Sequence, residues 1–110
     1  MAGLDISNIA AQMGAAAAGV LKDKWPDARS FAENEFEKLA HTFVSIGEQF
    51  AARRINEEQA ELLLDIQKNA ARTVLLSLEG LAILAVEEAI NAALDAVKSI
   101  VNKAVGFALL

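Results

Sequence analysis

The stretch AENEFEKLAHTFVSIGEQF, residues 32–50, decides the fold class, because its large apolar side chains recur at helical spacing. The positions are Ala32, Phe36, Leu39, Phe43, Ile46 and Phe50, separated by 4, 3, 4, 3 and 4 residues. Such a heptad pattern is typical of a helix that packs against other helices in a bundle or a coiled coil. The stretch therefore predicts a helix with one apolar seam.

Boundary signals on both sides of this seam predict further helices. Pro26 cannot continue a preceding helix but suits the first turn of a new one, so we expect helices over about 5–22 and 26–53. The sequence Asn56-Glu57-Glu58-Gln59 fits a capping box, which predicts a new helix from 56. Because the link from 53 to 56 is short, the helices on either side of it should form an antiparallel hairpin.

The segment after residue 56 contains no proline, yet its polar stripe changes side. Glu61, Asp65, Lys68, Arg72 and Glu79 share one face, and the later polar residues centre on a face more than about 100° away. Gly80 is the natural break, giving helices at about 56–79 and 81–105. We predict a single all-α domain over 1–110, a four-helix, mainly antiparallel bundle. The alternative is three helices, with a long kinked C-terminal helix packed in a dimer.

Composition narrows the function classes. Of the 110 residues 55% are hydrophobic, which excludes a disordered chain. The net charge is −5 and the basic residues alternate with acidic ones, so we expect no nucleic-acid partner. With no cysteine, thiolate chemistry is excluded. The first 21 residues carry Asp5 where a signal peptide has basic residues, so we read them as a helix of a cytoplasmic protein.

No residue pattern predicts a catalytic, metal or cofactor site. His41 lies on the face opposite the seam, one turn after Glu37, as a solvated surface pair would. The Glu-x-x-His pairs of di-iron bundles are absent. The acidic residues in 33–37 are explained by a solvated polar face, and only Glu33 and Glu35, which flank the seam, are placed so that they could turn partly inward. Glu79 continues the polar stripe and is expected to face solvent.

The apolar surface predicts a role in protein contacts. The tail from Phe107 to Leu110 is uncharged and must dock on its own bundle, on a second subunit or in lipid, and we favour a subunit contact. The residues expected to carry the contacts are Phe36, Leu39, Phe43, Ile46, Phe50, Ile90, Leu94, Val97, Val101, Val105, Phe107, Leu109 and Leu110. We therefore predict a non-enzymatic bundle, without cofactor, that binds itself or another helical protein.

Two other functions stay open at this point. The first is a membrane-active or lipid-binding bundle that inserts residues 73–110 as a hairpin, although the apolar part of this segment, 73–86, is too short to span a bilayer. The second, ranked lowest, is a carboxylate-bridged metal-binding bundle.

Overall fold

The computed structural model describes residues 4–110, and every regular element in that range is helical. The element order is α1 (Ile6–Leu21), a short 3-10 turn (Lys22–Lys24), α2 (Trp25–Ala51), α3 (Glu57–Leu76) and α4 (Ile83–Val105). The prediction of an all-α fold is confirmed.

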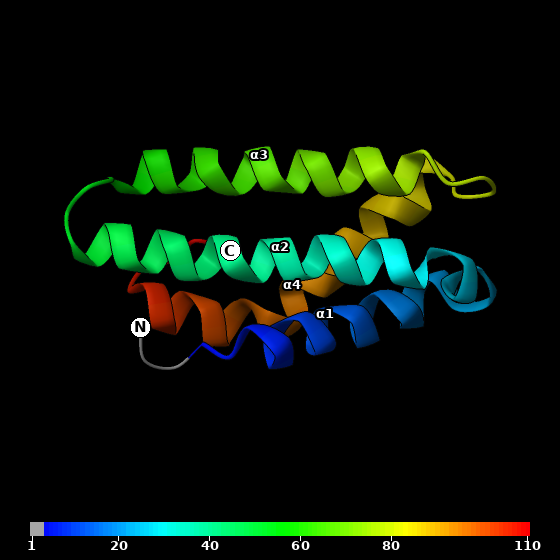
Figure 1. Ribbon diagram of the computed structural model, residues 1–110, viewed down its shortest axis with the longest axis horizontal. Coiled ribbons are helices and arrows are strands. Elements are labelled where there is room, and N and C mark those ends of the chain that lie inside the picture. The colour runs from blue at the N-terminus through cyan, green and yellow to red at the C-terminus, as the bar shows by residue number, and fades with distance from the viewer. Residues whose placement is uncertain (1–3) are drawn as a thin grey trace.

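The helices form an elongated bundle with extents of 43 × 22 × 18 Å (Figure 1). Consecutive helices α1, α2 and α3 run antiparallel, and α4 returns obliquely across the bundle. The most extensive packing joins α4 to α1, whereas α3 rests mainly on α2 and contacts α4 much less. As a result, α3 lies at one edge of the molecule.

Side-chain caps begin two of the helices. The Asp5 carboxylate accepts a hydrogen bond of 3.2 Å from the backbone N–H of Asn8 at the start of α1. At the start of α3, Asn56 accepts from the Gln59 N–H at 2.8 Å, and the Gln59 side chain accepts from the Asn56 N–H at 2.9 Å. The predicted capping box is therefore confirmed.

The expected break near Gly80 is a turn from Ser77 to Ala82. Gly80 has φ 86°, a left-handed conformation that favours glycine, and a Cβ there would lie 3.2 Å from the Lys24 Nζ. The chain leaves α3 at Leu76, three residues before the predicted end at 79. The Ser77 hydroxyl donates to the Val74 carbonyl at 2.6 Å, which closes the last turn of the helix. The polar stripe therefore changes side because the chain turns between two separate helices and not because one helix is kinked.

The core is built from one face of each helix. The α2 seam contributes Ala32, Phe36, Leu39, Phe43 and Ile46, all fully buried. α1 adds Ile9, Met13, Ala17 and Leu21, and α4 adds Val86, Ala89, Ile90, Ala93, Val97 and Val101. α3 contributes only Ala60, Leu64, Ala71 and Leu75. Because only four α3 side chains are buried and two of them are alanines, α3 contributes least to the core.

Candidate functional site

Most residues expected to contact a partner lie in the chain's own core. Phe36, Leu39, Phe43, Ile46, Ile90, Val97 and Val101 have no exposed surface, and Leu94, Val105 and Leu109 are 8%, 4% and 7% exposed. These side chains are not accessible to a partner in this fold, which corrects the sequence-based choice. A helical apolar pattern indicates which side chains avoid water, but not whether the same chain or another covers them.

The apolar tail also docks on its own bundle rather than at a subunit contact. The Phe107 ring packs on that of Phe50 with centroids 4.5 Å apart and planes tilted by 42°. The Leu110 N–H donates to the Asn102 side-chain oxygen at 2.9 Å, and the Asn102 side-chain nitrogen donates to the Leu110 carbonyl at 3.4 Å. Phe50, Phe107 and Leu110 are accordingly half-buried. These intrachain contacts close this end of the bundle.

The most exposed large apolar side chains lie instead on α3 and on the first turn of α4, while Phe31 on α2 and Ile100 on α4 are 48% and 40% exposed. Leu62 and Ile66 are each 60% exposed and Leu76 is 37% exposed, while Ile83 and Leu84 are 66% and 75% exposed. We define the outer face of α3 by its exposed residues Leu62, Ile66, Asn69, Ala70, Thr73 and Leu76. It lies opposite the buried α3 residues that contact the core. Large exposed apolar side chains that share one face are typical of an interaction surface.

Sequence reasoning missed the outer face because Leu62 belongs to a run of three leucines. Leu64 is buried, Leu63 is half-buried and Leu62 is exposed, although the three are adjacent in sequence. The available signal is the four-residue spacing of Leu62 and Ile66, which places both on one side of a helix.

A charged edge runs along the outer face of α3. Its members are Glu61, Asp65, Lys68 and Arg72, which were expected to face solvent. Glu61 and Asp65 are exposed, but Lys68 and Arg72 are half-buried because this edge of α3 turns toward α4. The edge is therefore acidic in the first half of the helix and basic in the second.

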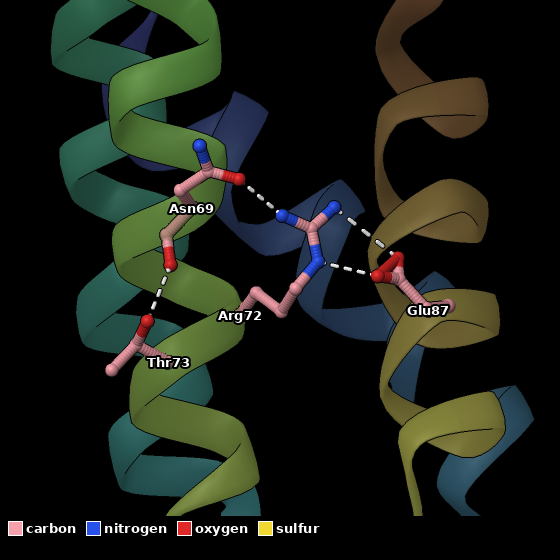
Figure 2. A network of polar contacts seen from close by, with 4 residues as sticks. All are labelled: Asn69, Arg72, Thr73 and Glu87. Carbon is pink, nitrogen blue, oxygen red and sulfur yellow. Dashed lines mark hydrogen bonds and ion pairs between the residues drawn. The ribbon is translucent and has the colours of Figure 1, made fainter.

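Arg72 connects α3 to α4 (Figure 2). Its guanidinium donates to both carboxylate oxygens of Glu87, with a distance of 3.2 Å from Nη2 to Oε2. The Arg72 guanidinium also donates to the side-chain oxygen of Asn69. The backbone carbonyl of Asn69 accepts a separate hydrogen bond of 2.9 Å from the Thr73 hydroxyl. The hydrogen bonds from Arg72 hold the pKa of Glu87 below its ordinary value; burial opposes this, and the positive charges of Arg72 and Lys68 add to the lowering.

Beyond this ion pair α3 and α4 leave an open groove of about 500 Å³ between them. Glu61, Asp65 and Lys68 line the α3 wall, and Asn91 and Asp95 line the α4 wall. Apolar groups at the base come from Leu64, Leu94 and the tail residues Leu109 and Leu110. The lining contains no histidine, serine or threonine, so it offers neither an imidazole base nor a hydroxyl nucleophile.

The other candidate groups are placed as follows. His41 and Glu79 are exposed, as predicted. Glu35 is 2% exposed and accepts from Lys38 at 3.1 Å, whereas Glu33 is exposed and pairs with Arg29 at 3.2 Å, so the inward turn is confirmed for Glu35 only. Across residues 4–110, no three acidic or histidine side chains are grouped to hold a metal ion.

Within the described part of the chain, no helix has both the length and the apolar character needed to cross a membrane. Comparison with protein-family models, with curated proteins and with solved structures finds no match.

Proposed function

We propose that this chain is a non-enzymatic helical module that acts by associating with itself. The observation that supports the proposal is the set of large apolar side chains left exposed on α3 and at the start of α4. The core and the docked tail bury most of the chain's large apolar side chains, but neither covers Leu62, Ile66 or Ile83.

The exposure of these apolar side chains to water has a cost in free energy. Burying a leucine or isoleucine side chain is worth about 1.5 to 3 kcal/mol relative to leaving it in water. Leu62, Ile66, Ile83 and Leu84 are each at least 60% exposed, so a second surface that covers them gains free energy without rearranging the fold. Self-association needs only a second copy of the same chain, and closed dimers are the commonest assembly of soluble proteins.

Insertion of residues 73–110 into a membrane has less support. Ile90, Val97 and Val101 form the core with α1 and α2, so insertion would have to dismantle the bundle. Carboxylate-bridged metal binding has less support still: although Glu61, Asp65 and Asp95 line one groove, no three acidic or histidine side chains in residues 4–110 are grouped closely enough to hold a metal ion. A cytoplasmic location stays a prediction that rests on the N-terminal sequence.

The test of self-association is sedimentation equilibrium over a wide range of protein concentration. We expect the mass to rise from that of one chain, 11.7 kDa, toward twice that value. A mass of one chain at every concentration would contradict the proposal. Flotation with neutral and anionic vesicles, in the same buffer, tests the membrane alternative, and we expect the protein to stay with the unbound fraction.

A further inference from the structure

The charged edge of α3 has a pattern that indicates how two copies meet. Glu61 and Asp65 lie in the first half of the helix, and Lys68 and Arg72 lie in the second half. Among the described residues Glu61, Asp65 and Lys68 form no ion pair, while Arg72 pairs with Glu87. Across the outer face, the opposite edge of α3 carries the uncharged residues Leu63 and Val74.

Only one relative orientation of two such helices matches charge with charge. When two copies of a helix pack in parallel, one edge of the first meets the opposite edge of the second; here a charged edge would meet an uncharged one. When they pack antiparallel, each edge meets its own copy running in reverse. The acidic half of one edge then lies beside the basic half of the other.

We propose that a second copy of this chain docks on the outer face of α3, with the two α3 helices antiparallel about a two-fold axis. The inference rests on the proposed self-association and names its surface. With the axis between residues 66 and 67, Asp65 lies opposite Lys68 of the partner subunit, and Glu61 lies opposite Arg72 of the partner subunit. Both pairs occur twice, because the interface is symmetric.

The apolar part of the face fits the same register. Ile66 lies beside the axis and meets its own copy, and Leu62 lies over Ala70 of the partner subunit, whose small side chain leaves room for it. Arg72 keeps its hydrogen bonds to Glu87 and Asn69, which use three of its five N–H donors, and reaches a second carboxylate with the remaining two. Ile83 and Leu84 share none of this charge pattern and are not needed for the pairing.

Disulfide trapping tests the orientation, because the chain contains no cysteine of its own. Two copies of an Ile66→Cys variant would be offset by only about 1.5 Å along the helix axis, within reach of a disulfide. Two copies of the matched Gln59→Cys variant would be about 22 Å apart and out of reach. We expect at least a tenfold faster disulfide-linked dimer from Ile66→Cys, whereas parallel helices would link both variants alike.

Charge reversal tests the register. We expect Asp65→Lys and Lys68→Glu each to weaken the dimer by about tenfold at low salt, because each creates two like-charged contacts. The double variant restores opposite charges and should regain the original dissociation constant. A double variant that is as weak as the single variants would overturn the register.

Ile66→Asp tests the apolar contact and should weaken the dimer by more than about 100-fold. Its matched control is Ile100→Asp on α4, where the side chain is 40% exposed and outside the proposed face, and this variant should leave the dimer unchanged. Circular dichroism of each variant verifies that the helices are retained.

The outcomes separate this inference from the proposed function. If the unmodified chain is monomeric at every concentration, both fail. If it is a dimer that survives Ile66→Asp, or that links through Gln59→Cys as fast as through Ile66→Cys, the antiparallel pairing of α3 is wrong and self-association stands on another surface.

Discussion

Helices α3 and α4 are similar in length and both amphipathic, yet they use their apolar residues differently. In α4 the residues Ile90, Val97 and Val101 are fully buried against α1 and α2. In α3 the inner residues Ala60, Leu64, Ala71 and Leu75 are buried, but Leu62 and Ile66 on the outer side remain 60% exposed. Apart from Ile83 and Leu84 in its first turn and Ile100, α4 buries its large apolar residues on one face, whereas α3 has a second apolar face that stays exposed.

An apolar stripe on a helix does not by itself identify an interface with a partner. The stripe of α4 is the more regular of the two and is the one that sequence reasoning assigned to a partner, but it closes the core. The surface left for a partner is the second, shorter apolar row of α3. Interaction surfaces in small bundles are therefore better sought where a helix has more apolar residues than its own core needs.

The largest expected contrast between the two helices comes from placing one charge on each. Val97→Asp buries an unpaired carboxylate in the core and should lower the free energy of unfolding by more than about 4 kcal/mol. Ile66→Asp places the same group on an exposed face and should change it by less than about 1 kcal/mol. Urea denaturation at low protein concentration measures both. Similar losses from the two variants would mean that the outer face of α3 belongs to the core.

A second contrast lies within α3, between two adjacent leucines. Leu75→Ala removes a fully buried side chain and should cost about 3 kcal/mol, whereas Leu76→Ala removes one that is 37% exposed and should cost less than about 1 kcal/mol. Thermal unfolding followed by circular dichroism compares them. Equal melting temperatures for the two variants would contradict the different burial of Leu75 and Leu76.

The turn that joins the two helices gives a smaller effect. Gly80→Ala forces a side chain into a left-handed conformation, with φ 86°, and should destabilise the fold by about 1 to 2 kcal/mol. Gly19→Ala is the control: a Cβ there meets nothing within 4 Å, so better helix propensity should stabilise the fold by about 1 kcal/mol. In chemical denaturation, the two substitutions should shift the unfolding midpoint in opposite directions. A Gly80→Ala variant that is more stable than the native chain would contradict the strained turn.

The smallest effect concerns the ion pair between the helices. Because the pKa of Glu87 is lowered in the fold, its contribution to stability is present above the ordinary value of 4.5 and is lost as the pH falls through the lowered pKa. The free energies of unfolding of the native chain and of the Glu87→Gln variant should therefore differ at neutral pH and become equal in acid. If the two free energies of unfolding differed by a constant amount down to strongly acidic pH, the contact with Arg72 would not be the source of the stabilisation by Glu87.

The structural features that the sequence predicts correctly are those that depend on residues close together along the chain. The seam of α2 follows from the spacing of Phe36, Leu39 and Phe43, the capping box follows from Asn56 and Gln59, and the break follows from Gly80. Asp5 also caps a helix, and its position just before an apolar periodic segment could have been recognised as an N-cap signal. Each of these features depends only on residues a few positions apart.

What the sequence does not predict depends on how helices meet. Arg72 and Glu87 are 15 residues apart, and they pair only because the turn from Ser77 to Ala82 sets the angle between α3 and α4. The polar stripe of α3 was expected to face solvent along its whole length, but half of it faces α4. The groove and the outer face follow from that same angle, so neither could be assigned from periodicity.

The packing of α1 against α4 has a consequence for the order of folding. These helices are far apart in sequence, so their contact closes the longest loop, whereas the α2–α3 hairpin closes a short one. We expect the hairpin to form before the rate-limiting step and the contact between α1 and α4 to form after it. A substitution in the buried face of α4, the helix that packs most extensively on α1, such as Val101→Ala, should then accelerate unfolding and leave the refolding rate almost unchanged, as a stopped-flow chevron would report.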